Sequence, residues 1–217
     1  MARSFTAANS DALYVESAIV SSPPCTFAAW FNVSNITAAH PLIVIGDKDA
    51  TQQINMRCSG NIAGDPVRIN LLGASAGVVA DTTSGYSAST WQHACGVVTA
   101  VNAYAVFLNG GSKGSDTTNA GSITLLDRTV IGANALLSSF ANGNIAEAAI
   151  WDVALTDAEV AILAKGFSPL LVRPQSLVFY APLVRDNDDD LIGGVALSAN
   201  GTPGIVPHPR VLYPGHN

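Results

Sequence analysis

The sequence predicts an all-β fold: a two-sheet antiparallel β-sandwich with one short helix near residues 157–165 and an extended C-terminal arm. Short apolar segments recur along the chain with Gly, Asp and Pro between them, which favours a sandwich over alternating strands and helices. An Asn-Gly pair after an alternating segment adds a hairpin. At 217 residues, the chain fits one sandwich domain with a substantial core.

The first strands are expected at residues 12–15 and 27–33, with the Ser-Ser-Pro-Pro segment 21–24 as the break between them. In the second strand, Phe27 and Phe31 share one face while Trp30 takes the other, so both faces carry bulk. This strand is therefore predicted to lie inside a sheet. Further short strands are expected at 42–45, 54–57 and 67–72.

The most secure hairpin ends at Asn109-Gly110, because both central positions of a type I′ turn need positive φ, which Asn and Gly tolerate best. A later strand at 145–151 precedes the helix signal. Thr156 is placed as the N-cap and Glu159 completes a capping box. Lys165 and the following Gly166 mark the end of this helix.

The order of these elements resembles the laminin-G-like, concanavalin A-like jelly roll family, in a phage-type member. The matching features are Ser4-Phe5 with residues 11–15, the segment 27–31, Trp91 with Asn109-Gly110, the strand 143–151 and Leu155-Thr156. The resemblance implies a jelly roll sandwich with its core in residues 1–166. It implies less about function, because one such sandwich hosts lectins, glycan hydrolases, adhesion modules and virion proteins.

The rest of the chain extends beyond a minimal domain of that family. Residues 176–198 are expected to add a strand, an Asp/Gly turn and a second strand, so that the domain spans 1–200. Residues 201–217 hold four prolines and are expected to form an extended arm that docks on a neighbouring subunit rather than on its own sandwich. The predicted partner-binding residues are Pro207, His208, Arg210, Leu212 and Tyr213.

The composition limits the classes of partner. A formal net charge of −6 and a pI near 4.9, without a basic stripe, argue against nucleic acid. No apolar run approaches the roughly 20 residues of a membrane-spanning helix, and the first residues lack a signal-peptide block. Because only 12% of residues are charged and 48% are hydrophobic, we expect surface buried against partners, including copies of this chain.

No metal or cofactor is predicted. Asp47 and Asp49 lie on a loop where calcium is a minor alternative, since Lys48 stands between them. The run Asp186–Asp190 suggests an EF-hand loop, but Leu191 and Leu197 occupy positions where that loop needs Gly and Glu. We expect a solvated turn at Asp186–Asp190, and unpaired, buried cysteines at Cys25, Cys58 and Cys95.

The sequence also argues against an enzyme. The segment 73–77 matches the G-x-S-x-G pattern around Ser75, but a strand follows it where a nucleophile elbow needs a helix. Glycan hydrolases require two carboxylates that flank one bond. The corresponding strand offers only Glu147, which is expected to make a structural hydrogen bond or salt bridge. His93 and the tryptophans are expected in the core.

Two function classes remain. The first is a non-enzymatic structural or adhesive component of a phage particle, such as a decoration, spike or fibre protein, made in the host cytoplasm and displayed on the virion surface beside other virion proteins. The alternative is a carbohydrate-binding module that holds a glycan through aromatic stacking and neutral polar groups.

Overall fold

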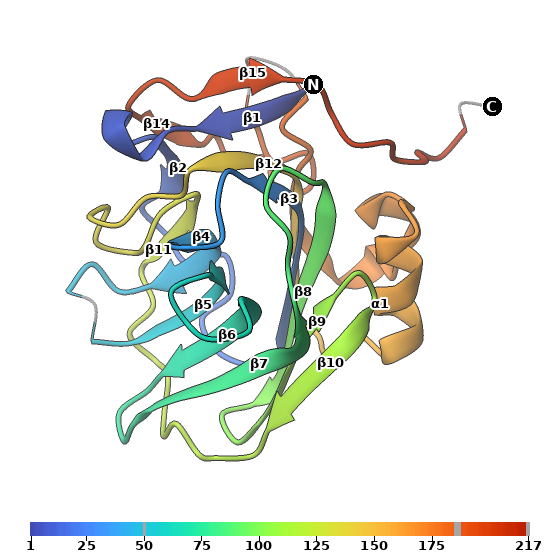
Figure 1. Cartoon of the computed structure of the whole chain (residues 1–217). Coiled ribbons are helices and arrows are strands. Elements are labelled where there is room, and N and C mark those ends of the chain that lie inside the picture. Colours follow the sequence, from blue (N-terminus) through green and yellow to red (C-terminus); the bar gives the residue numbers. More distant parts are fainter. Residues whose placement is uncertain (50, 185–187, 216–217) are drawn as a thin grey trace.

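The computed structural model describes residues 1–49, 51–184 and 188–215, and folds them into two antiparallel sheets packed face to face (Figure 1). The eight-stranded sheet has the order β10-β9-β8-β3-β12-β1-β15, with β13 also paired to β12. The seven-stranded sheet has the order β14-β2-β11-β4-β5-β6-β7. The predicted all-β sandwich is therefore confirmed.

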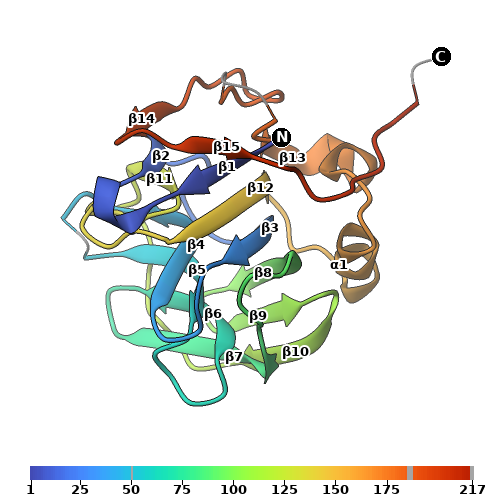
Figure 2. The ribbon, with the colours of Figure 1, turned by 45° about the horizontal axis from the view of Figure 1, so that its top comes forward.

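The strands of the eight-stranded sheet are β1 (Ala2–Phe5), β3 (Cys25–Val33), β8 (Gln92–Ala100), β9 (Ala103–Leu108), β10 (Gly111–Asp116), β12 (Gly143–Trp151), β13 (Leu177–Ala181) and β15 (Gly204–Val206). Those of the seven-stranded sheet are β2 (Ala12–Val15), β4 (Ala39–Gly46), β5 (Gln53–Ser59), β6 (Pro66–Leu72), β7 (Gly77–Gly85), β11 (Arg128–Ile131) and β14 (Ser198–Asn200). The helices are η1 (Ala7–Asn9), α1 (Asp157–Ala164), η2 (Pro169–Leu171) and η3 (Pro174–Ser176). Figure 2 shows β1, β12, β3 and β8 side by side in one layer.

Strand β3 lies in the middle of its sheet, as its sequence predicts, between β12 and β8. Its residues alternate between two packed layers. Phe27 and Phe31 belong to the central core between the sheets, while Ala28 belongs to a second apolar cluster on the outer face of the sheet. Because both faces of β3 are packed, its sequence is apolar at nearly every position.

The hairpin between β9 and β10 has the expected turn. Asn109 and Gly110 have φ values of 53° and 72°, both in the left-handed region that a type I′ turn requires. The Asn109 side chain also accepts a hydrogen bond of 2.9 Å from the His93 backbone N–H, which ties the turn to β8. The position of β10, which carries part of the site described below, follows from this turn.

Helix α1 begins at the predicted capping box. Thr156 Oγ1 accepts a hydrogen bond from the Glu159 backbone N–H, and the Glu159 carboxylate accepts one from the Thr156 backbone N–H. Val160 and Leu163 pack against the outer face of the eight-stranded sheet, in the cluster that contains Trp151. Figure 1 shows α1 on the side of this sheet that faces away from the seven-stranded sheet.

The C-terminal segment differs from the expected arrangement. β13 joins β12, whereas the second expected strand begins only at Ser198, as β14, and joins β2 in the opposite sheet. The arm also docks on its own sandwich rather than standing clear of it, because β15 pairs with β1 in the register Ala2↔Val206. The prolines flank this three-residue strand and leave its N–H groups free to pair, which the sequence reasoning overlooked.

Candidate functional site

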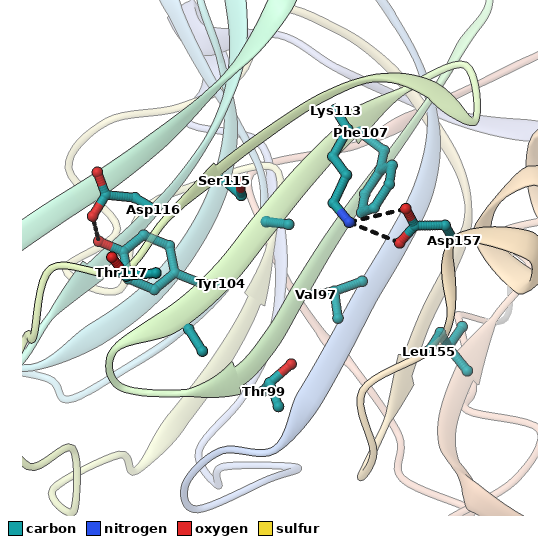
Figure 3. Close-up of a pocket in the computed structure, with 12 residues that line it drawn as sticks. Val97, Thr99, Tyr104, Phe107, Lys113, Ser115, Asp116, Thr117, Leu155 and Asp157 are labelled. Atoms are coloured by element: carbon teal, nitrogen blue, oxygen red, sulfur yellow. Dashed lines mark hydrogen bonds and ion pairs between the residues drawn. The ribbon is translucent and has the colours of Figure 1, made fainter.

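An open cleft of about 270 Å³ lies on the outer face of the eight-stranded sheet, between β8, β9, β10 and the start of α1 (Figure 3). Strand alternation aims every second side chain of these strands to this face. Its lining comprises Val97, Thr99, Ala103, Tyr104, Ala105, Phe107, Lys113, Ser115, Asp116, Thr117, Leu155 and Asp157.

One end of the cleft carries an ion pair over an aromatic ring. Lys113 Nζ lies 2.9 Å from both carboxylate oxygens of Asp157 and 5.2 Å from the centroid of the Phe107 ring. Figure 3 shows the lysine beside the Phe107 ring, with dashed lines from its ammonium group to the Asp157 carboxylate. The Asp157 side chain is 67% exposed, so both charged groups are open to a ligand from solvent.

Behind the other end of the cleft, Tyr104 belongs to the central core and forms a compact hydrogen-bonded corner with Asp116, its partner in the register of β9 and β10. Asp116 Oδ1 accepts bonds from the Thr118 backbone N–H at 2.5 Å and from Tyr104 Oη at 3.1 Å. The bonds from Thr118 hold the pKa of Asp116 below its usual range. Burial, together with this carboxylate, raises the pKa of Tyr104. Asp116 is therefore engaged by donors of the chain itself.

Between these ends, the hydroxyl groups of Thr99, Ser115 and Thr117 make no hydrogen bond within the described part of the chain. They surround the apolar side chains of Val97 and Leu155. Apolar surface with a few converging polar groups is the usual lining of a small-molecule site. A sugar ring, which has apolar faces and hydroxyl edges, matches this lining.

The two carboxylates of the cleft do not form a hydrolytic pair. Asp157 is neutralised by Lys113, Asp116 is held by Tyr104 and Thr118, and Figure 3 shows the two at opposite ends of the cleft. A retaining glycosidase needs its carboxyl groups only about 5 to 5.5 Å apart across one bond. Asp116 and Asp157 lack this arrangement.

The sequence reasoning missed this cleft, because it did not predict β10 as a strand. Gly111–Asp116 is short and polar, and no apolar alternation reveals it. The usable signal was the Asn109-Gly110 turn, since a hairpin turn requires a strand after it as well as before it. That reasoning would have placed Lys113 and Ser115 on one face.

Glu147 makes structural hydrogen bonds, as expected, but inside the protein. It is only 2% exposed, has a φ of 55°, and lies where β12 bulges between its pairings with β3. Its carboxylate accepts hydrogen bonds of 2.7 Å from Tyr180 Oη and Tyr213 Oη, and His208 Nε2 lies 3.1 Å away. Burial and the nearby carboxylate raise the pKa of both tyrosines.

The arm residues proposed to bind a partner are thus partly engaged within the chain. Tyr213 and His208 contact Glu147, and the Leu212 backbone bonds to Gly166 and Ser168. The Leu212 side chain is 49% exposed, and Pro207 and Arg210 are also exposed. That these residues bind a partner stays a prediction.

The turn expected to be solvated at Asp186–Asp190 is not: Asp188 and Asp190 are buried, and like Asp47 they bind groups of the chain itself. Asp47 accepts bonds from the backbone N–H groups of Thr51 and Gln52, which overcome the effect of burial and lower the pKa of Asp47. Asp190 accepts bonds from the N–H groups of Tyr180, Ile192 and Gly193, and Asp188 pairs with Arg3. Asp186 lies outside the described residues. Among those that are described, no three His, Cys, Asp or Glu side chains gather as a metal site would require.

The other sequence candidates are structural. Ser75 lies in the turn between β6 and β7, a strand-to-strand connection that cannot form a nucleophile elbow. Cys25, Cys58 and Cys95 are buried and unpaired. His93 is buried with its ring edge against Trp30, at 5.5 Å between centroids, and burial lowers the pKa of His93 to about 3.

Trp151 lies in the outer-face cluster with its indole N–H bonded to the Val172 carbonyl, whereas Trp30 and Trp91 are only partly buried. Of the three tryptophans expected in the core, Trp151 is therefore the one that is fully buried. Of the helices in the described ranges, none combines the length and hydropathy needed to cross a membrane.

Residues 7–161 match the family described as the concanavalin A-like lectin/glucanases superfamily. The sequence matches no curated protein. Among solved structures, a heptameric SAP-like pentraxin from Limulus polyphemus shares 15% identity, with 89% of this chain and 87% of that chain covered and a TM-score of 0.63.

Two further structures are similar. Domain 4 of AbnA, an extracellular arabinanase from Geobacillus stearothermophilus solved with arabinotriose, shares 24% identity over 70% of this chain and 71% of that one, with a TM-score of 0.58. Tailspike protein 2 of bacteriophage CBA120 shares 14% identity over 83% of this chain but only 29% of the tailspike, with a TM-score of 0.60. At these low identities, the structural similarity shows a common fold alone.

Proposed function

Because this chain belongs to the concanavalin A-like lectin/glucanases superfamily, we propose that it is a non-catalytic carbohydrate-binding module whose cleft beside β10 holds a sugar. The observation that carries this proposal is the cleft itself. Unpartnered hydroxyls and the Lys113–Asp157 pair surround an apolar surface. Such a lining offers donors and acceptors to sugar hydroxyls and apolar contact to the ring.

The similar structures support the same class of ligand. The arabinanase domain is described in complex with arabinotriose, and a module from a Ruminococcus gnavus sialidase is described bound to sialyllactose. Both share the sandwich found here. In this chain the separated, individually compensated carboxylates of the cleft and the buried Glu147 favour binding without hydrolysis.

A glycan array followed by calorimetry tests the proposal. Ser115→Trp would fill the cleft, and Lys113→Ala would remove a charged donor whose hydrogen bond contributes about 1.5–3 kcal/mol, or about 10-fold or more in affinity. Lys165→Ala is the matched control, because it removes the same charge from an exposed position at the end of α1. An array without hits, or equal binding by all variants, would contradict the proposal.

As a second candidate, we propose that the domain is displayed on a phage particle, as a decoration, spike or fibre component. The low fraction of charged residues, the mean hydropathy of +0.31 and the sandwich shared with a phage tailspike support this role. It is compatible with glycan binding, since an adhesive virion protein also contacts sugars. Mass spectrometry of purified particles would detect the chain, and size-exclusion measurement would detect self-association.

A further inference from the structure

The lysine of the cleft is aimed by an irregularity in its strand. The register of β9 and β10 shifts between Gly111 and Gly114, so two residues, Ser112 and Lys113, stand opposite Phe107. A bulge of this kind re-aims a side chain. Here Lys113 Nζ lies 5.2 Å from the centroid of the Phe107 ring, where a cation is attracted to the ring face. The lysine is therefore held in place before a ligand arrives.

The carboxylate that faces this lysine is not needed by its own helix. Asp157 is the first residue of α1, but Thr156 and Glu159 supply both parts of the capping box. Asp157 instead accepts 2.9 Å hydrogen bonds from Lys113 on both of its oxygens. The two side chains are 44% and 67% exposed, and an exposed ion pair contributes little to stability. Stability therefore does not account for the placement of this pair in the cleft.

The pair keeps hydrogen-bonding capacity for a ligand. A lysine ammonium has three N–H donors and an ionised carboxylate has about four acceptor sites, of which the contacts between Lys113 and Asp157 use only a part. A donor and an acceptor side by side match two adjacent hydroxyls of one sugar ring. One hydroxyl accepts from Lys113 while its neighbour donates to Asp157, and the apolar face of the ring contacts Val97 and Leu155.

The charges of the cleft select against an acidic ligand. Among the described residues that line it, Lys113 is the one cation, and Asp157 already neutralises it. Behind the other end of the cleft, Asp116 adds a second carboxylate. The cleft holds about 270 Å³, near the lower limit of about 300 Å³ for ligand pockets, so a carboxylate on a bound sugar would lie close to these groups. It would meet repulsion without a free cation.

We infer that the cleft selects neutral sugars with two adjacent free hydroxyls, and that Lys113 and Asp157 together determine this specificity. The inference rests on the proposed function, which requires only that a sugar binds, and adds which sugars do. Asp157 has two tasks in this arrangement: it accepts from the diol, and it keeps Lys113 from pairing with a carboxylate of the ligand. Without Asp157, the ammonium would form a charge-assisted hydrogen bond to such a carboxylate.

The test compares methyl glycosides of gluco, galacto, manno and arabino configuration with forms that lack one ring hydroxyl, and with glucuronate, galacturonate and mannuronate. Calorimetry measures each affinity. We expect at least one neutral glycoside to bind, and to lose about 10-fold or more in affinity when either hydroxyl of one adjacent pair is removed. Every uronate should bind about 10-fold or more weakly than the best neutral glycoside.

Asp157→Asn should raise the affinity for uronates by about 10-fold, because it frees Lys113 to pair with their carboxylate. Asp152→Asn is the matched control: it removes the same charge from an exposed position outside the cleft and should leave the preference for neutral sugars unchanged. Melting temperatures of both variants show whether they fold. Asp157→Asn should fold, since the capping box does not use this side chain.

Three results would each overturn the inference: a uronate that binds the unmodified protein as tightly as the best neutral glycoside, equal affinity for all forms lacking a hydroxyl, or no gain of uronate binding in Asp157→Asn. If neutral glycosides still bound and were lost in Ser115→Trp, the proposed function would stand while this inference failed. If no glycoside or glycan bound at all, both would fall.

Discussion

Tyr213 Oη donates a 2.7 Å hydrogen bond to Glu147 Oε1, and so joins the end of the C-terminal arm to the centre of the eight-stranded sheet. The two residues are 66 positions apart in sequence. Tyr213 is 46% exposed and Glu147 is 2% exposed. A tyrosine at the surface therefore supplies one of the hydrogen-bond donors to a buried carboxylate.

Tyr213→Phe should destabilise the fold by about 1–3 kcal/mol, because the buried Glu147 carboxylate loses one of its donors. Chemical denaturation measures this change in the free energy of unfolding. Tyr14→Phe is the control: Tyr14 is partly buried and its hydroxyl makes no hydrogen bond in the described part of the chain. Equal stability of the two variants would show that the arm does not hold Glu147.

His93 should make stability fall as the pH drops below about 6.5, the ordinary histidine value in an unfolded chain. In the folded chain, burial lowers the pKa of His93 to about 3, so only the unfolded chain takes up this proton between pH 6.5 and 3. The loss is about 1.4 kcal/mol for each pH unit.

His93→Leu should reduce the slope of stability against pH between 6.5 and 5 by about that amount, as followed by denaturant unfolding. A remaining slope would belong to His40, whose pKa burial also lowers. At pH 8 both histidines are neutral in both states, so that pH is the internal reference. An unaltered slope in His93→Leu would count against a neutral, buried His93.

Thr156→Ala should cost about 0.5–2 kcal/mol, the usual range for loss of an N-cap. The effect extends beyond the helix, because Glu159 also binds Arg173 through bonds of 2.8 and 2.9 Å and so fixes the segment after α1. Thermal unfolding measures the loss. Thr83→Ala, at an exposed position in β7, should leave the melting temperature unchanged.

Calcium and EDTA should leave the melting temperature unchanged. The oxygens of Asp47 and Asp190 accept backbone N–H bonds, and a cation would have to displace those donors. Differential scanning fluorimetry with calcium and with EDTA tests this expectation. A shift of more than about 10 °C, larger than a 1 to 2 kcal/mol effect in a domain of this size, would reveal a structural metal site.

The features that sequence reasoning predicted correctly are local ones. The Asn109-Gly110 turn and the Thr156–Glu159 capping box depend on residues at most three positions apart, and their chemistry is fixed by backbone geometry. The contacts it missed join distant segments. Arg3 binds Asp188 at a separation of 185 residues, and no periodicity in either segment signals that pairing.

The outward-facing polar residues of β5 and β6 lie between these cases. Alternation along β5 predicts that Asn55 and Arg57 share a face, but only the register with β6 places Asn70 and Arg68 beside them. Strand β10 and its cleft were missed for a different reason: β10 is short and polar, so no apolar alternation reveals it.

The two short strands near the C-terminus affect solubility as well as stability. β15 lies beside β1 and β14 beside β2, so one segment supplies an edge strand of each sheet, and both edge strands are only three residues long. Removing residues 198–217 would leave unpaired N–H and C=O groups on both sheets at once. Open edges of this kind pair with other chains. A truncated chain would therefore be prone to aggregate even where its core still folds.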